Sequence, residues 1–318
     1  MWHLLARRIA RSVPLVIVVT AITFVLESLV PGDTARAMVG VLGTQVQYER
    51  MRVELGLNLP LWDQYARYMS HLVRGDMGVS AFSGEAVTRL LDQRLPVTLS
   101  LVILTTLFCG VVGAGLGVFT AVREGPLGRA VDVLSVLGLA LPSFLIALVL
   151  VTALSVKAGL FPATGYVPLT SSPWGWLVAL VLPVVALGFG PIAIVAKQSR
   201  DSMKDALSSE YIRTLRGCGL ARWRVLWKHA LRNAAIPTVT VLGLVFVSAL
   251  SFSVFVEQVF VLPGLGSLAV TATTQHDIPV IEGVTVYFTL LVVAVNLILD
   301  VVYSVLNPKV RQGWQLSK

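Results

Sequence analysis

The sequence predicts an all-α integral membrane protein with six transmembrane helices, and its composition, apolar blocks and charge placement each favour that class. Of the 318 residues, 56% are hydrophobic and only 13% are charged, and the mean hydropathy is +0.81. A soluble domain has about 45–50% apolar and about 25% charged residues. A water-soluble fold of this size could not bury so much apolar surface, so that class is excluded.

The apolar residues are gathered in long blocks. A helix needs about 20 apolar residues to cross the hydrocarbon core of a bilayer. The blocks of that length are Ile9–Val30, Val97–Val122, Val131–Val156, Trp174–Ala196, Thr238–Val261 and Val284–Leu306. Prolines inside several blocks are compatible with spans, because neighbouring helices and local adjustments satisfy the freed backbone groups. The first block follows three arginines as a signal peptide would, but its length favours a retained span.

The placement of lysine and arginine predicts which side each loop faces, because cytoplasmic loops carry an excess of both. Seventeen of the 25 lie at the termini, in the second-to-third loop and in the 197–237 loop. The first loop holds seven more, matched by seven acids, and it is about 60 residues long, a length that translocates largely regardless of charge. We therefore expect both termini and residues 197–237 to be cytoplasmic.

Cysteines and histidines give no sign of a metal or redox site. Cys109 lies in an apolar block and Cys218 in the basic loop, so the two thiols are expected at different membrane levels and cannot pair. The four histidines show no ligand spacing. The net charge is +8, and the basic residues that produce it lie beside the apolar blocks, as membrane topology signals do. No nucleic acid partner is therefore expected.

The first loop, residues 31–96, is too patterned to be a simple connector. Helical stretches are expected over Gln45–Leu55 and over Pro60–Val73, the second with an apolar stripe. Two compatible interpretations are a small external cap and a surface that meets a delivery protein or shapes an external gate. We divide the chain into an N-terminal span with this loop, residues 1–96, and a core of five spans, residues 97–318.

The loop of residues 197–237 contains two predicted amphipathic helices. The first is expected over 210–216, after a serine cap, and glycines 217 and 219 end it. Its apolar face consists of Tyr211, Ile212 and Leu215, flanked by Arg213 and Arg216. The second is expected over 222–233. Three interpretations fit: binding to anionic lipid, packing on the protein's own helix ends, or docking into a groove of a soluble partner.

One stretch of this loop favours docking through a resemblance. It runs Glu210-Tyr211-Ile212-Arg213-Thr214-Leu215-Arg216-Gly217-Cys218-Gly219-Leu220, followed by His229-Ala230-Leu231-Arg232-Asn233 and Pro237. This order of an acid, a glycine nine residues on and a later proline resembles the cytoplasmic coupling loop of binding-protein-dependent ABC import permeases. The Tyr-Ile-Arg-Thr form is similar to the dipeptide/oligopeptide branch, although Cys218 stands where that branch often has lysine.

Further segments resemble the same branch in the same order along nearly the whole chain. They are Pro31-Gly32-Asp33, Leu55-Gly56-Leu57, Gly75-Asp76-Met77-Gly78, Arg94-Leu95-Pro96, Gly159-Leu160-Phe161-Pro162, Glu257-Gln258-Val259-Phe260, Leu262-Pro263-Gly264-Leu265-Gly266 and Asp277-Ile278-Pro279-Val280. The ending Asn307-Pro308-Lys309 departs from the usual Asp-Pro-Arg, and His276 stands where arginine is common.

The resemblance implies a type I ABC importer-like permease in the plasma (inner) membrane of a prokaryote, importing di- or oligopeptides. It implies a homologous second permease subunit, two ATP-binding cassette subunits and an extracytoplasmic substrate-binding protein as partners. The residues implied in ATPase coupling are Glu210, Tyr211, Ile212, Arg213, Leu215, Arg216, Gly219 and Leu220. The apolar face of this helix is expected to anchor it in the ATPase subunits, with the two arginines at the rim.

Nucleotide chemistry is expected in the partners, because the chain has no phosphate-binding loop. Gly113 and Gly117 lie in an apolar block and indicate close helix packing instead. ATP and Mg would thus be bound by partner subunits, and this chain would be a non-catalytic subunit without a cofactor. The rivals are a secondary transporter, an intramembrane enzyme, and an importer of a nickel complex, glutathione, haem or an opine; the substrate-binding residues stay open.

Overall fold

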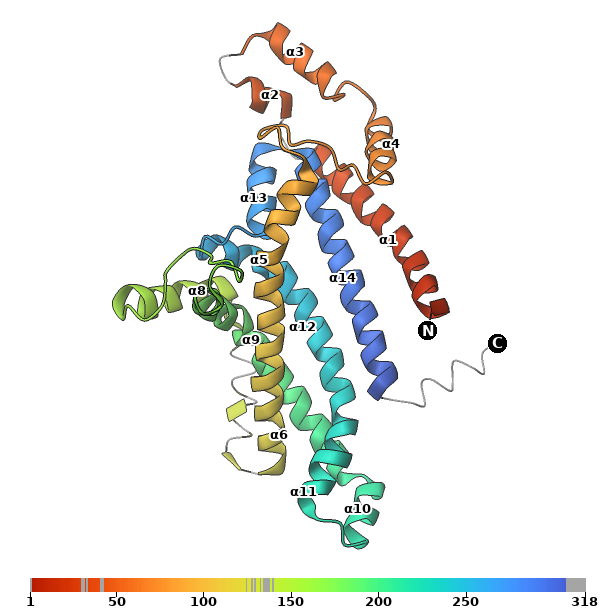
Figure 1. Ribbon diagram of the computed structural model, residues 1–318, viewed down its shortest axis with the longest axis vertical. Coiled ribbons are helices and arrows are strands. Elements are labelled where there is room, and N and C mark those ends of the chain that lie inside the picture. Colours follow the sequence, from red (N-terminus) through yellow and green to blue (C-terminus); the bar gives the residue numbers. More distant parts are fainter. Residues whose placement is uncertain are drawn as a thin grey trace. The chain divides into compact units, whose positions relative to one another are not determined.

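The structure is a computed structural model that describes residues 2–306 apart from 30, 31, 33, 41, 42, 124, 127, 129, 132, 134–137 and 139. Its described part is helical (Figure 1), with no strand and with one isolated antiparallel bridge, between Val79 and Ala86. Helices long and apolar enough to cross a membrane cover Ser12–Leu29, Val87–Val122, Pro173–Ser208, Arg222–Val259 and Ile278–Val302. The predicted all-α, multi-pass fold is confirmed.

Five such helices are present among the described residues, where the sequence predicts six. The difference lies in the third block, part of which is outside the described residues. Pro142 caps α8 (Ser143–Leu150) in an extended conformation, with ψ 137°. Proline disfavours helix in the residue before it and cannot donate a backbone hydrogen bond, so a new helix starts here. With η2 (Val151–Lys157), a π-helical segment, it gives a shorter apolar helix, Ser143–Lys157.

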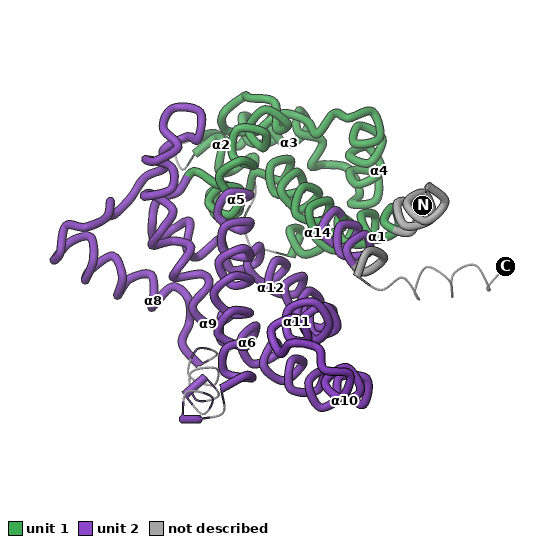
Figure 2. Tube along the Cα trace, turned by 60° about the horizontal axis from the view of Figure 1, so that its bottom comes forward, with its two compact units in different colours: residues 1–98, 263–293 green, residues 99–262, 294–318 purple. Residues whose placement is uncertain are grey.

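The chain forms two compact units (Figure 2). Unit 1 comprises residues 1–98 and 263–293, and unit 2 comprises residues 99–262 and 294–318. The predicted division after residue 96 remains a prediction. The two units differ from it because residues 263–293 belong to unit 1. The elements of unit 1 are α1 (Trp2–Leu29), α2 (Thr34–Val39), α3 (Gln45–Glu54), α4 (Leu61–Leu72), the start of α5 (Val87–Phe108), α13 (Leu265–Gln275) and most of α14 (Ile278–Leu306).

The core of unit 1 lies where α5, α13 and α14 meet. Its buried residues are Val87, Leu91, Leu265, Leu268, Ala272, Val280, Ile281 and Val284. Gly283 allows the close approach, because a Cβ there would lie 2.6 Å from the Val87 side chain. The helices expected in the first loop are present as α3 and α4. Tyr65 of α4 packs on α1: its hydroxyl lies 3.0 Å from the Thr20 hydroxyl and donates to the Ile17 carbonyl at 2.8 Å.

Unit 2 is built around α9 (Pro173–Ser208), which packs against α6 (Ala114–Val122), α8 and α12 (Leu231–Val259). Gly113 and Gly117 face α9 as the sequence predicts: a Cβ at Gly117 would lie 2.4 Å from the Ala196 carbonyl oxygen. A side chain would push the helices apart, so these glycines set the packing distance. The remaining elements are the π-helical η1 (Cys109–Gly113), α10 (Glu210–Gly217), α11 (Arg222–Arg224) and the π-helical η3 (Val225–Ala230).

Candidate coupling site

The predicted short helix is present as α10, directly after α9. Ser209 separates the two helices because its extended backbone, with ψ 149°, cannot continue α9. The predicted serine cap is only partly realised: Ser209 is the N-cap residue, but its hydroxyl donates backwards to the Ala206 carbonyl at 2.5 Å. Glu210 lies in the first turn, where its negative charge interacts favourably with the positive end of the helix dipole. Figure 1 shows α10 and α11 close together at one end of unit 2.

Ile212 anchors α10 to its own chain. Its side chain is fully buried. The buried residues of this cluster, here called the anchor cluster, are Ala121, Met203, Ala206, Ile212, Val225, Ala230 and Ala234, with Leu215 and Leu220 packed against it. The cluster therefore joins α10 to α6, α9, η3 and α12. Ile212 is thus enclosed by residues of its own chain, including α9 and α12, and the expectation that it inserts into a partner stays a prediction.

Tyr211 fixes the other side of α10 through its hydroxyl group. The Asn233 amide donates to the Tyr211 hydroxyl at 2.6 Å, and the Tyr211 hydroxyl reaches the His229 carbonyl at 3.5 Å. The ring stays exposed, at 39%. Sequence reasoning assigned no role to Asn233, although it belongs to the stretch that resembles the coupling loop. A polar contact between residues 22 positions apart leaves no periodic signal in a sequence.

Gly219 ends α10 as the sequence predicts. The Leu220 amide donates to the Leu215 carbonyl at 3.3 Å, and the Gly219 amide donates to the Arg216 carbonyl at 3.0 Å. This pair of bonds is the Schellman ending, which needs a left-handed residue between them. Gly219 has φ 77°, a conformation that glycine adopts without the penalty of a Cβ. Leu215 and Leu220 both pack on the anchor cluster, so the turn adds to the anchoring of α10.

The outer side of α10 is polar. Glu210, Arg213 and Arg216 are exposed. No acidic side chain among the described residues makes an ion pair with either arginine. The structure thus separates the predicted coupling residues into two groups. Ile212, Leu215, Gly219 and Leu220 hold the helix in place, whereas Glu210, Arg213, Arg216 and the edge of the Tyr211 ring are accessible to a partner.

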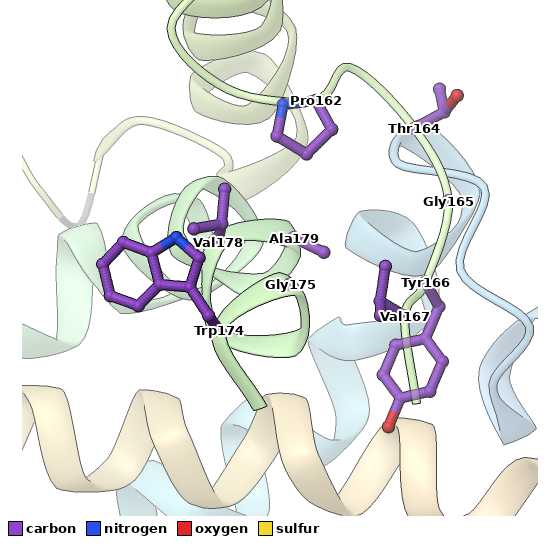
Figure 3. Close-up of a pocket in the computed structure, with 9 residues that line it drawn as sticks. All are labelled: Pro162, Thr164, Gly165, Tyr166, Val167, Trp174, Gly175, Val178 and Ala179. Carbon is purple, nitrogen blue, oxygen red and sulfur yellow. The ribbon is translucent and has the colours of Figure 1, made fainter. Parts of the chain in front are cut away.

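A second feature of unit 2 is a hollow of about 370 Å³ beside the first turns of α9. Figure 3 shows the loop with Pro162 and Tyr166 running past Trp174 and Val178 of the helix. None of its lining residues is charged. It therefore offers no charged side chain that would pair with the termini of a peptide. No group of three or more His, Cys, Asp or Glu residues in the described part of the chain could hold a metal ion.

Two family models match the chain. The binding-protein-dependent transport system inner membrane component matches residues 113–312, and the N-terminal part of the membrane component of such systems matches residues 1–102. The chain belongs to this permease family. The coupling-loop stretch of residues 210–220 lies inside the first match. The resemblance found in the sequence is therefore confirmed.

Full-length relatives agree with the family. A Brucella abortus protein named as a peptide transport system permease is 38% identical over 98% of this chain and 99% of its own length. The oligopeptide permease AppB of Bacillus subtilis is 36% identical over 96% of this chain and 98% of its own length. The dipeptide permease DppB of Escherichia coli is 33% identical over 98% of this chain and 99% of its own length. The chain is thus a permease of the peptide-type ABC importers.

Proposed function

We propose that this permease imports di- or oligopeptides and couples their passage to ATP hydrolysis in two partner subunits. In the proposed assembly, a homologous second permease forms the other half of the pathway, and an extracytoplasmic binding protein delivers the substrate. ATP and Mg are bound by the ATP-binding cassette subunits. Both termini and residues 197–237 face the cytoplasm, in agreement with the basic residues concentrated there. The names of the relatives support peptides as the cargo.

The observation that carries the coupling role is the two-sided construction of α10. Its inner side is locked by Ile212 in the anchor cluster, and its outer side presents Glu210, Arg213 and Arg216. A helix gripped from outside transmits force only if it cannot slide on its own support. The fully enclosed Ile212 and the bond from Asn233 to Tyr211 provide that support.

The anchor cluster also defines where a movement would go. It contains residues of α9 and α12, both of which are long enough to span the membrane. When the ATPase subunits close on ATP, a shift of α10 would carry the ends of α9 and α12 with it. A ligand or partner can shift such an equilibrium only by as much as it binds one state better than the other. The exposed charges of α10 are the groups on this helix that can supply that difference.

The test uses the assembled complex in proteoliposomes with the double variant Arg213→Glu, Arg216→Glu. Both side chains are exposed, so the fold should be unaffected. An exposed ion pair contributes about 0.2–1 kcal/mol, so removing two should reduce transport-linked ATPase activity by about twofold to thirtyfold. Arg222→Glu is the matched control, because it makes the same charge change at an exposed position on α11. Equal activity of the double variant and the control would refute the coupling role.

The cargo is tested separately on the cognate binding protein and the reconstituted complex. Uptake of a labelled dipeptide is measured in competition with unlabelled peptides, glutathione, haem and a nickel complex. We expect only peptides to compete and to stimulate ATP hydrolysis. Stimulation by one of the other three, without stimulation by peptides, would overturn the peptide assignment and leave the coupling role of α10 intact.

A further inference from the structure

An apolar groove runs along unit 2 beside the anchor cluster. Its volume is about 450 Å³. It is lined by Gly110, Val111, Ala114, Gly115, Val118, Phe119 and Val122 on one side and by Leu226, Trp227 and Leu231 on the other. None of these residues is charged. The groove lies between η1 and α6 on one side and η3 and the start of α12 on the other. Both sides belong to helices long enough to span the membrane.

Small residues on the open face of η1 and α6 form the floor of this groove. Gly113 and Gly117 face α9, but Gly115 lies between them and has no atom within 4 Å of the place where a Cβ would be. The walls are larger and partly open: Phe119 is 44% and Trp227 is 58% exposed. A long apolar chain between these walls would bury this exposed apolar surface.

Exposed basic residues directly follow three lining residues of the groove in the chain. The pairs are Val122–Arg123, Trp227–Lys228 and Leu231–Arg232. The Arg123 guanidinium lies 5.1 Å above the ring of Phe119, which itself lines the groove. Among the described residues, no carboxylate makes an ion pair with any of the three cations. An apolar groove with Arg123 beside its lining and two more exposed cations next to lining residues in the chain matches a molecule that has an apolar tail and an anionic head.

We propose that this groove binds one acyl chain of an anionic phospholipid, with the lipid phosphate held by Arg123, Lys228 and Arg232. The proposal rests on the proposed function in one respect, the cytoplasmic location of these three residues, where anionic headgroups and basic side chains meet. The arrangement lets long basic side chains keep their charge at the headgroup level while their stems cover the groove. A helix of another permease subunit would match the apolar floor as well, but an anionic lipid also supplies a counter-charge for the basic residues.

The bound lipid would act on coupling through a shared residue. Val118 lines the groove and also packs against the anchor cluster that holds Ile212. Ala121, one turn further on, is a buried member of that cluster. An acyl chain in the groove would press on the same part of α6 that supports α10. Anionic lipid should therefore stiffen the support of α10 without touching its exposed face.

The experiment uses the complete complex in phosphatidylcholine nanodiscs that contain a small share of a photoactivatable lipid. The lipid carries a diazirine in its acyl chain and either a phosphatidylglycerol or a phosphatidylcholine head. We expect the glycerol lipid to label the segments 110–122 and 226–231 several-fold more than the choline lipid. The double variant Arg123→Gln, Lys228→Gln should lower this preference about fivefold for each charge removed. Gly115→Leu should abolish the labelling by filling the groove.

The matched control is Arg222→Gln, an exposed arginine of the same loop that follows no lining residue. It should leave the labelling unchanged. Equal labelling by both lipids would show a general lipid contact and overturn the proposal. Absence of labelling by either lipid in the wild-type complex would show that another subunit covers the groove, and would also overturn it. The readout needs no ATP hydrolysis, so it fails or succeeds independently of the coupling role of α10.

Discussion

Among the described residues, unit 1 and unit 2 each enclose one fully buried glutamate, and the two carboxyl groups differ in their contacts. Glu257 of α12, in unit 2, is buried with a polar or electrostatic interaction. Glu282 of α14, in unit 1, has no hydrogen-bond partner in the described part of the chain for either carboxyl oxygen. A buried polar group without a hydrogen bond costs about 1–3 kcal/mol, so the two carboxyl groups should have opposite effects on stability.

Near α10 and near Glu282 the same difference recurs, although unit 2 also buries the Thr105 hydroxyl without a partner in the described part of the chain. In unit 2, Ser199 of α9 and Thr238 of α12 share a buried hydrogen bond of 3.2 Å, and Asn233 holds Tyr211. In unit 1, the hydroxyl of Tyr68 and Nε2 of His276 are also buried without a partner in the described part of the chain. Burial, together with the nearby Glu282 and Tyr65, raises the pKa of Tyr68 well above its usual value.

The difference distinguishes the α10 end of unit 2, where the polar contacts are made, from the part of unit 1 around Glu282, where buried polar groups lack partners. Satisfied polar groups and a closed apolar cluster make the α10 end of unit 2 suited to transmit force without deforming. Unsatisfied buried groups lower the stability of unit 1, and they would gain partners in any rearrangement that brought donors to Glu282. Proteins commonly keep such unfavourable local arrangements where function requires a change of state.

Ile212→Ala should produce the largest effect, because it empties the centre of the anchor cluster. Large-to-small substitutions in a packed core cost about 2–5 kcal/mol. Melting of the complex in nanodiscs should shift to lower temperature, and peptide-stimulated ATP hydrolysis should fall further than binding of the ATPase subunits does. Val46→Ala, an exposed position on α3, is the control. Melting unchanged by Ile212→Ala would mean that the anchor cluster does not support α10.

The paired variants Glu282→Met and Glu257→Met test the contrast directly. Methionine has a similar shape and removes the carboxyl group. We expect Glu282→Met to stabilise the protein by about 1–3 kcal/mol and Glu257→Met to destabilise it by a similar amount. Peptide uptake should fall in both variants: Glu282→Met would stabilise one state against the change that transport needs, and Glu257→Met would weaken the fold. Destabilisation by Glu282→Met would show that this carboxyl group has a partner in the working assembly, and the contrast between the units would disappear.

The parts of the fold that sequence reasoning predicted are those that depend on neighbouring residues. Membrane-spanning helices are read from about 20 consecutive apolar residues. The end of α10 is read from Gly219, because a left-handed turn requires a glycine at one position. Hydropathy does not register the interruption at Pro142 in the third block, and because part of that block lies outside the described residues, its prediction as one span stays a prediction.

The parts that could not be predicted depend on residues far apart in the chain. Ile212 looks the same in the sequence whether it faces lipid, a partner or its own core, and only the positions of Met203, Val225 and Ala234 decide. The unpartnered groups of unit 1 come from α3, from α4, from the residue after α13 and from α14, and no local pattern links them. For the same reason the groove lining was not foreseen.

Gly219→Val should have a moderate effect that is confined to α10. A left-handed backbone costs a residue with a Cβ about 1–2 kcal/mol, and more for a β-branched one. Space does not limit the substitution, since nothing lies within 4 Å of the added Cβ. We expect the end of α10 to fray and ATPase stimulation to fall while the melting temperature changes little. Gly217→Ala, at the last helical position, is the matched control and should be nearly neutral. Full transport by Gly219→Val would contradict the role of this turn.

Tyr211→Phe should have the smallest effect, because it removes a single hydrogen-bonding group from the support of α10. The substitution keeps the ring and removes the hydroxyl that accepts from Asn233. Because both groups are reachable by water, the loss should be at the low end of the range of about 0.5–1.5 kcal/mol for one hydrogen bond. Amide exchange of the start of α12 should quicken by a few-fold, and Asn233→Ala should give the same change. If the effects of the two substitutions added fully in the double variant, the two side chains would act separately, and the contact would contribute nothing to the support of α10.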